Sequence, residues 1–208
     1  MRFSFIGMSN IGKTYWSKRI AAAQGIDYIC CDSLIEKQLG PELKALGYRG
    51  LRDVAKWMGQ PADPQYGENS ARYIACEKQA MHDIIDRLRA DAKMPAVIDT
   101  TGSVIYTGAE TLAALRELTR VVYFEASDAH IEDLFRRYIA HPKPLIWGSS
   151  YAPQNGEDAR QTLKRCYPEL LRKRGQRYHE LAHVTIPFDR HRERHMDLVG
   201  FIGEMGKP

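Results

Sequence analysis

The 208-residue sequence has few of the features that mark secreted, membrane or disulfide-bonded proteins. Its four cysteines, Cys30, Cys31, Cys76 and Cys166, contain no C-x-x-C pair, and adjacent Cys30 and Cys31 are poorly placed to bridge each other. We therefore expect free thiols in a reducing, cytoplasmic environment. No apolar run is long enough to span a bilayer, and the N-terminus lacks an apolar segment followed by a cleavage site. Neither membrane insertion nor secretion is expected.

A large excess of one charge is also missing. The 30 Lys and Arg residues nearly balance the 26 Asp and Glu residues, which leaves a net charge of +4. The densest run, DRHRERH at 189–195, is short, and we interpret it as a solvated turn and helix start. This balance argues against a nucleic-acid partner, because a binding face needs clustered cations. His191 and His195 lie one helical turn apart among arginines, which is a poor setting for a metal ion.

The sequence does contain the material for one globular domain, since 44% of its residues are apolar and 27% are charged. Short apolar runs alternate with amphipathic segments. The expected strands are 2–6, 26–31, 96–98, 121–125 and 184–186, and the expected helices are 13–24, 33–39, 68–92, 109–119, 128–140, 158–183 and 196–205. This alternation predicts an α/β fold with a five-stranded parallel sheet flanked by helices.

Two segments interrupt the alternation. Residues 40–67 look irregular because they hold several Gly and Pro residues, although LRDVAKWM within them is typical of a short helix. Pro168 lies inside the long helix expected at 158–183, and we expect it to kink that helix.

The stretch GMSNIGKT, Gly7–Thr14, fits the pattern G-x-x-x-x-G-K-[ST]. A β-run enters it and a helix leaves it, which is the setting that a phosphate-binding loop requires. Glycines let successive N–H groups point at phosphate oxygens, and the helix N-terminus adds partial positive charge. The residues predicted to hold nucleotide phosphates are Gly7, Asn10, Ile11, Gly12 and Lys13. Thr14 is predicted to take a Mg²⁺ coordination position, so ATP and Mg²⁺ are the expected cofactors.

Two aspartates end predicted strands at the edge where ligands bind in parallel sheets. Asp32 is suited to orient an acceptor hydroxyl and take its proton, which would make it both catalytic and substrate-binding. The alternative is a charge that stabilises a helix N-terminus. Asp99 closes the apolar run AVID, the Walker-B arrangement for Mg²⁺, with a turn-forming aspartate as the alternative.

The runs FIGMSNIGKTYWSKRIA at 5–21 and DSLIE at 32–36 resemble the shikimate kinase family, and the likeness continues along most of the chain. GENSAR at 67–72 is similar to the family's Gly-Glu-x-x-Phe-Arg, which implies that Arg72 grips a substrate carboxylate. LLRKRGQRYHELAHVTI at 170–186 maps a second substrate arginine onto Arg174. Arg136 falls where the family places an arginine against adenine, and KPLIWG at 143–148 looks like the segment that leads into a lid.

The resemblance implies one P-loop kinase domain over residues 1–208, with a substrate-binding insertion at about 40–67 and a mobile lid at about 142–157. The implied activity is ATP-dependent phosphoryl transfer to a hydroxyl of a small molecule. Lys143 would be a catalytic residue that stabilises charge on the transferring group, and Gly102 would contact substrate in the family's glycine loop. Two arginines suit a planar carboxylate, so a polyhydroxylated carboxylic acid is the expected acceptor. We expect a monomer or weak dimer.

The acceptor half departs from the family pattern. Cys30 stands in place of the first aspartate of Asp-x-Asp, Lys143 in place of an arginine, and TTG at 100–102 in place of three glycines. These departures leave the acceptor open between shikimate and another compound. Two further hypotheses stay open: a nucleotide or nucleic-acid-end kinase that stacks bases on Tyr66 and Tyr73, and a nucleotide-binding sensor without catalysis.

Overall fold

Five strands form one sheet in the order β2-β3-β1-β4-β5. They are β1 Arg2–Ile6, β2 Asp27–Cys30, β3 Ala96–Asp99, β4 Arg120–Phe124 and β5 Val184–Ile186. Every pairing between them is parallel, so the predicted α/β fold with a five-stranded parallel sheet is confirmed. The structure is a computed structural model that describes residues 1–206, apart from the side chain at position 51.

The register of the sheet brings the ends of four strands to nearly one level. Cys30 of β2 pairs with Asp99 of β3, Asp99 pairs with Phe5 of β1, and Ile6 pairs with Tyr123 of β4. The loops that leave these strands therefore begin at one level, at the carboxyl edge of the sheet. In open α/β sheets this edge is where ligands bind.

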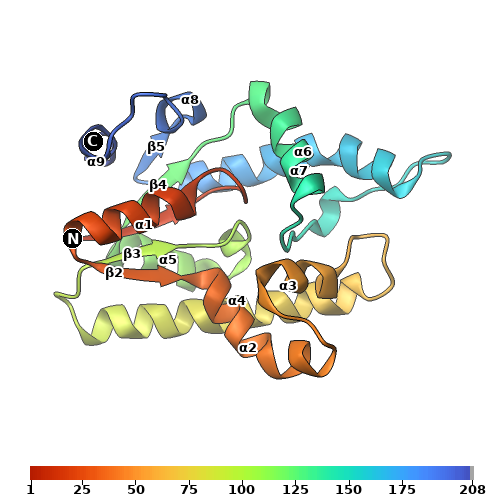
Figure 1. Ribbon diagram of the computed structural model, residues 1–208, viewed down its shortest axis with the longest axis horizontal. Helices are drawn as coiled ribbons and strands as arrows, with labels where there is room; N and C mark the ends of the chain where they lie inside the picture. The colour runs from red at the N-terminus through yellow and green to blue at the C-terminus, as the bar shows by residue number, and fades with distance from the viewer. Residues whose placement is uncertain (207–208) are drawn as a thin grey trace.

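Helices surround the sheet in the order that the alternating pattern predicts (Figure 1). They are α1 Lys13–Gln24, α2 Cys31–Ala45, α3 Gly50–Met58, α4 Tyr66–Ala90, α5 Ala109–Leu118, α6 Ile131–Ala140, α7 Ala159–Leu181, α8 Phe188–His191 and α9 Leu198–Met205. Short 3₁₀ helices η1 Val104–Tyr106, η2 Asp128–His130 and η3 Gly148–Ser150 lie in the loops.

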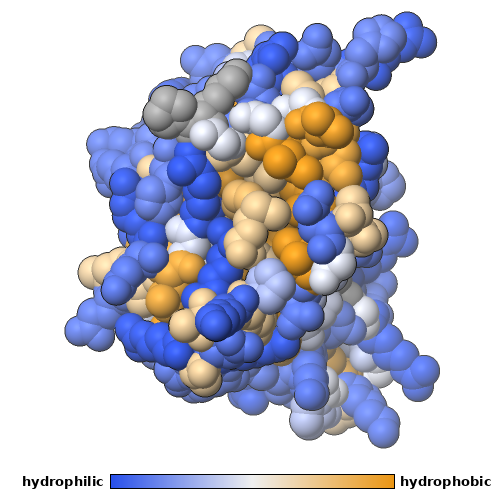
Figure 2. Space-filling view, turned by 90° about the vertical axis from the view of Figure 1, so that its left-hand side faces the viewer, coloured by the Kyte–Doolittle hydropathy of each residue, from blue (hydrophilic) through white to orange (hydrophobic). Residues whose placement is uncertain are grey.

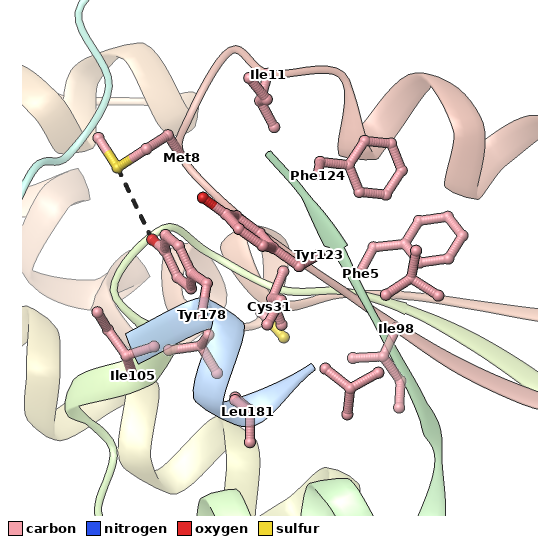
Figure 3. Close-up of a cluster of buried hydrophobic side chains, with 14 of the residues drawn as sticks. Phe5, Met8, Ile11, Cys31, Ile98, Ile105, Tyr123, Phe124, Tyr178 and Leu181 are labelled. Atoms are coloured by element: carbon pink, nitrogen blue, oxygen red, sulfur yellow. Dashed lines mark hydrogen bonds between the residues drawn. The ribbon is translucent and has the colours of Figure 1, made fainter. Parts of the chain in front are cut away.

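Aromatic side chains join the helices to both faces of the sheet. On one face Phe201 of α9 stacks on Trp16 of α1, with ring centroids 3.9 Å apart, and meets Phe5 of β1 edge-on. On the other face Tyr178 of α7 packs against Tyr123 of β4, as Figure 3 shows. Each fully buried side chain of this size stabilises the fold by about 1.5–3 kcal/mol. The central strands, which carry the site at their ends, are thus held firmly.

The prediction of irregular backbone at 40–67 is wrong over much of that segment. Helix α2 continues to Ala45 through Gly40 and Pro41, and α3 forms where LRDVAKWM indicated a helix. The cause is tertiary burial: Ile35, Leu39 and Leu43 recur at helical spacing and share a small core with apolar residues of α3 and α4. This burial outweighs the cost of a proline inside a helix. In Figure 1 these elements form a helical unit beside the sheet.

Helix α7 stays one helix through Pro168. Its N-terminus is fixed by a capping box, in which Gln161 N–H donates to the Asp158 side chain and Asp158 N–H donates to the Gln161 side chain, both at 2.8 Å. From this helix Arg174 and Tyr178 reach the loop after β3, at the carboxyl edge of the sheet.

The interpretation of 189–195 as a solvated turn is wrong for the middle of the run. Helix α8 begins at Phe188, and His191 at its end is buried between the rings of Phe124 and Phe188. Burial lowers the pKa of His191 to about 4, so the buried ring is neutral at pH 7. Arg192 turns back onto the phosphate-binding loop.

The face at the amino ends of the strands carries no part of the site. Figure 2 shows one large and one smaller hydrophobic area on this face, with hydrophilic side chains around them. Within residues 1–206, no helix combines the length and the apolar character needed to cross a membrane. All four cysteines are free.

Candidate active site

The loop between β1 and α1 has the backbone of a phosphate cradle. Gly7 and Gly12 have φ angles of 135° and 125°, and Asn10 lies in the left-handed region with φ 65°. A Cβ added at Gly7 would lie 2.7 Å from the Phe124 carbonyl oxygen, so no larger residue fits there without displacing β4. Only glycine reaches this combination of angle and close approach without strain.

Lys13, the first residue of α1, is 6% exposed. Its Nζ donates hydrogen bonds to the carbonyls of Gly7 at 2.7 Å and Met8 at 3.1 Å. Burial lowers the pKa of Lys13, and the nearby carboxylates of Asp99 and Asp32 oppose that shift. The ammonium group therefore lies inside the loop, close to Asp99 at the end of β3 and to Asp32 in the first turn of α2 rather than at a strand end.

One cavity of about 170 Å³ brings most of the predicted residues together. Its wall is formed by the β1–α1 loop, two acids, the loop after β3 and a basic residue from the 143–148 segment. The lining residues are Ser9, Asn10, Gly12, Lys13, Thr14, Asp32, Asp99, Thr100, Thr101, Gly102 and Lys143. Gly7 and Ile11 are buried beneath this wall.

The two aspartates of the cavity are each fixed by a tyrosine. Tyr73 of α4 donates to Asp32 at 3.3 Å, and Tyr28 of β2 donates to Asp99 at 3.1 Å. Burial raises the pKa of Asp32, while Lys143 and Lys13 lower it. Asp32 is thus a carboxylate whose affinity for a proton is increased by its surroundings.

The loop Thr100–Gly102 lies directly against the phosphate-binding loop. A Cβ added at Gly102 would lie 3.3 Å from Ser9 N and 3.3 Å from Arg174 Nη1. The Gly102 carbonyl accepts hydrogen bonds from Arg174 and from Tyr178 of α7. Tyr178 also points at Met8 Sδ, 3.8 Å away (Figure 3). Helix α7 therefore holds both loops in one position.

The structure places Arg174 behind the cavity wall. This arginine is 1% exposed, donates to Gly102 O at 2.8 Å and to the Ile146 carbonyl, and lies over the Tyr106 ring. Its charge lies near the predicted binding side for the phosphoryl acceptor. Two of its N–H groups, however, already donate hydrogen bonds to backbone carbonyls of this chain.

Arg72 and Arg136 do not join the cavity wall. Arg72 forms an ion pair with Glu42 at 2.8 Å, and 55% of its side chain is exposed. Arg136 is 72% exposed beside Asp133 at 3.6 Å, and it borders a hollow between α6 and α7. The basic side chains near the phosphate-binding loop are instead Lys143 and Arg192.

Arg192 is a basic residue at the cradle that sequence reasoning missed. Its Nη2 donates to the Ile11 carbonyl at 3.1 Å and lies 3.3 Å from Asn10 O. With Tyr15 and Trp16 it lines a hollow of about 260 Å³ beside Gly12. The signal was hidden because Arg192 belongs to a charged run that is usually solvated.

Glu77 is a second missed residue. It is 0% exposed and accepts hydrogen bonds from Thr101 and from Ser103, the latter at 2.6 Å. Burial raises the pKa of Glu77 to about 7, against the effect of these hydroxyls. A signal was present: Glu77 is a charged residue on the buried stripe of α4 that also contains Tyr73 and Met81.

The segment predicted as a lid is attached to the site at its base. Tyr66 Oη donates to the Leu145 carbonyl at 3.0 Å and accepts from Trp147 N at 2.7 Å. Trp147 is 1% exposed. Further along, Arg165 of α7 binds Glu157 and the Ala152 carbonyl. Lys143, at the start of this segment, lines the cavity.

No protein-family model matches the chain, and no curated protein matches it. Solved structures do. The shikimate kinase from Bacteroides thetaiotaomicron aligns over 99% of this chain and 94% of its own, with a TM-score of 0.60 and 18% identity. The Aquifex aeolicus shikimate kinase covers the same shares, with a TM-score of 0.57 and 13% identity. The Acinetobacter baumannii shikimate kinase, solved in complex with shikimate, covers 97% and 87%, with a TM-score of 0.57 and 17% identity.

These likenesses show that the chain has the P-loop fold of the shikimate kinases. They agree with the resemblance carried by the motifs at 5–21, and they extend it over nearly the whole chain. At this level of identity, fold is what the comparison establishes, and the chemistry must be argued from the site.

Proposed function

We propose that this chain is an ATP-dependent kinase that transfers the γ-phosphoryl group to a hydroxyl of a small molecule. The observation that carries the proposal is the cavity in which the phosphate loop, Lys13, Asp32 and Asp99 share one wall. A buried lysine, two acids and a helix N-terminus at one point are the groups that bind a nucleotide phosphate and its Mg²⁺.

The residues of the cradle fit ATP and Mg²⁺. The loop has positive φ angles at Gly7, Asn10 and Gly12 and leads into the N-terminus of α1, where successive N–H groups would bind phosphate oxygens. The Thr14 hydroxyl and the Asp99 carboxylate are the oxygen donors that Mg²⁺ prefers, together with phosphate oxygens and water. When bound, Mg²⁺ would neutralise charge on the phosphates. Arg192, Tyr15 and Trp16 would border the nucleoside, a place that the sequence had assigned to Arg136.

On the acceptor side, Asp32 would orient the hydroxyl and receive its proton. Tyr73 fixes the carboxylate, and burial increases its affinity for a proton, so the group is suited to a general base. Lys143 would stabilise charge on the transferring group. Arg72 and Arg174 remain the candidates for a substrate carboxylate, as a polyhydroxylated acid would require, once the bonds described above are exchanged.

Residues at about 142–157 would close over the cavity and exclude water, which limits wasteful ATP hydrolysis. The segment at about 40–67, with α3, would form the substrate-binding side of a single domain. We place the enzyme in the cytoplasm as a monomer or weak dimer. The base-stacking hypothesis loses support, because Tyr73 is 1% exposed and Tyr66 is hydrogen-bonded to the lid.

A second candidate, a nucleotide-binding sensor, is favoured by one observation. Both arginines proposed for the acceptor are already bonded to groups of this chain, Arg72 to Glu42 and Arg174 to two carbonyls. A site that binds ATP and admits no acceptor would look like this.

A coupled ADP-release assay separates the two. The protein is given MgATP with no acceptor, with shikimate, and with a panel of polyhydroxylated acids, neutral polyols and nucleosides. Lys13→Ala is the negative control, and Lys18→Ala, an exposed lysine on the same helix, is the matched control. Turnover that depends on Lys13 and on one acceptor supports the kinase. Tight binding of a fluorescent ATP analogue without acceptor-dependent ADP release supports the sensor.

A further inference from the structure

Glu77 takes no part in the reaction outlined above, yet it holds one wall of the cavity. It lies on the buried side of α4, and each of its carboxylate oxygens accepts a hydrogen bond from a hydroxyl group. One comes from Thr101, which lines the cavity beside Asp32, and the other comes from Ser103 at 2.6 Å. A buried carboxylate is costly unless its oxygens are satisfied, so this cluster is a built feature.

The hydrogen bonds of Thr101 leave its hydroxyl oxygen one lone pair that can still accept a hydrogen bond. A hydroxyl has one proton and two lone pairs. The proton of Thr101 goes to Glu77, and one lone pair accepts from Ser103 N–H at 3.0 Å. The Ser103 hydroxyl is 3.0 Å away but gives its own proton to Glu77. Any ligand that meets the Thr101 oxygen must therefore donate to it.

The same loop is fixed from the opposite side by α7. Arg174 and Tyr178 both donate to the carbonyl of Gly102, between Thr101 and Ser103. The backbone position is thus set by α7, while the orientation of the two hydroxyls is set by Glu77.

We propose that Glu77 is a positioning residue that determines acceptor specificity: it turns Thr101 so that its oxygen accepts a hydrogen bond from a second hydroxyl of the acceptor. The inference rests on the proposed function. Asp32 would hold the hydroxyl that is phosphorylated, and Thr101 would hold one next to it. The acceptor class is then a polyol with neighbouring hydroxyls, and an analogue without the second hydroxyl is rejected.

The protonation of Glu77 gives this role a pH signature. Burial raises the pKa of Glu77 to about 7; Asp32 of α2 adds to the increase, and Arg174 of α7 opposes it. The other titratable groups around it, Tyr73, Tyr178 and Cys31, have pKa values raised by burial and stay neutral at pH 7.

Once Glu77 is protonated, it must donate one hydrogen bond where it formerly accepted two. The hydroxyl of Thr101 or of Ser103 then has to rotate. One of these two hydroxyls can then donate a hydrogen bond to the other, across the 3.0 Å between their oxygens. Acceptor binding should weaken as the pH falls below about 7.

The test compares Glu77→Gln with Asp86→Asn, an exposed residue of the same helix that loses the same charge. The acceptor is the compound that gives Lys13-dependent turnover, used alongside its analogue without the neighbouring hydroxyl. We expect Glu77→Gln to raise the acceptor KM by about tenfold, while kcat and the ATP KM stay nearly unchanged. The ratio of kcat/KM between the acceptor and the analogue that lacks the neighbouring hydroxyl should fall. The wild-type acceptor KM should rise from pH 8 to pH 6, and that of Glu77→Gln should not. Asp86→Asn should match the wild type.

A second pair of variants covers the case in which Glu77→Gln folds poorly. Thr101→Val keeps the shape and removes the hydroxyl, whereas Thr101→Ser restores it. The valine variant should reproduce the KM effect and the serine variant should reverse it. Loss of kcat at constant acceptor KM, a changed ATP KM, or identical pH profiles for wild type and Glu77→Gln would overturn the inference.

Binding separates this inference from the proposed function. If no compound is phosphorylated, the kinase proposal has failed, and calorimetric titration of shikimate and the neutral polyols in the presence of ADP still decides the role of Glu77. Weaker binding of a polyol to Thr101→Val than to Thr101→Ser supports it. Absence of polyol binding to the wild-type chain refutes it.

Discussion

At the scale of single residues, the site depends on a few positions where chemistry and backbone geometry coincide. Lys13, Gly7 and Gly12 lie within one contiguous motif, and a contiguous motif can be recognised from sequence because its spacing is set by one loop. Glu77 and Thr101 meet across a separation in the chain that only tertiary packing sets. Sequence reasoning therefore found the cradle but missed the carboxylate behind the Thr100–Gly102 loop.

Gly7 is the residue at which backbone geometry is most demanding. We expect Gly7→Ala to lower the free energy of unfolding by about 2 kcal/mol or more, because the new Cβ meets the Phe124 carbonyl at a φ angle that alanine rarely adopts. Binding of a fluorescent ATP analogue should also be lost. The measurements are urea unfolding and fluorescence titration. Gly67→Ala, where a Cβ meets nothing within 4 Å, is the control; equal effects of the two variants would contradict this account.

At the scale of elements, three arginines bind the carboxyl ends of helices at the edge of the sheet opposite the site. Arg2 donates to Leu88 O of α4 at 2.9 Å, Arg116 of α5 donates to Ala182 O after α7 at 2.7 Å, and Arg120 donates to Met205 O of α9 at 2.6 Å. A helix C-terminus has unpaired carbonyls and partial negative charge, which a guanidinium group satisfies. These contacts fix α4 and α9 to strands of the sheet and α7 to α5.

Arg116→Ala tests this arrangement. It removes the cation from the end of α7, and we expect the free energy of unfolding to fall by about 1–2 kcal/mol. Because α7 also holds the Gly102 loop, the acceptor KM should change more than the ATP KM. Arg89→Ala, an exposed arginine of α4, provides the comparison in denaturant unfolding. A stability loss no greater than that of Arg89→Ala would show that the carbonyls are satisfied by water.

The elements themselves were largely predictable, since strand and helix patterns survive wherever burial and local preference agree. The strands matched within a few residues, and α1 matched at both ends. The failures have physical causes: Pro41 and Gly40 predict a helix end, but Leu39 and Leu43 are buried on both sides of them. In α8, the charges around His191 concealed a residue that packs between aromatic rings.

At the scale of the whole molecule, two buried groups give stability opposite dependences on pH. Burial raises the pKa of Glu77 to about 7, so the folded state holds this proton more tightly than the unfolded state, and stability falls as the pH rises from about 4.5 to 7. Burial lowers the pKa of His191 to about 4, so the unfolded state binds its proton more tightly, and stability falls as the pH drops from about 6.5 to 4. The two slopes nearly cancel.

Removing either group should expose the slope of the other. We expect Glu77→Gln to gain stability relative to wild type on going from pH 4.5 to 7.5, by on the order of 3 kcal/mol. His191→Phe should gain a similar amount in the opposite direction, as the pH is lowered from 7.5 to 4.5. Urea unfolding at several pH values measures both. Parallel profiles for the two variants would contradict the assignment.

The attachment of the segment predicted as a lid has a consequence for which molecules can enter. Arg174 and Tyr66 bind consecutive carbonyls at Ile146 and Leu145, and Arg165 binds Ala152 and Glu157 further along. Between these two supports Trp147 and Ser150 are buried, so the segment has little room to move outward. Because this segment borders the opening of the cavity, its limited movement sets the size of that opening. We therefore expect the protein to select ligands by their cross-section before they form any hydrogen bond inside the cavity.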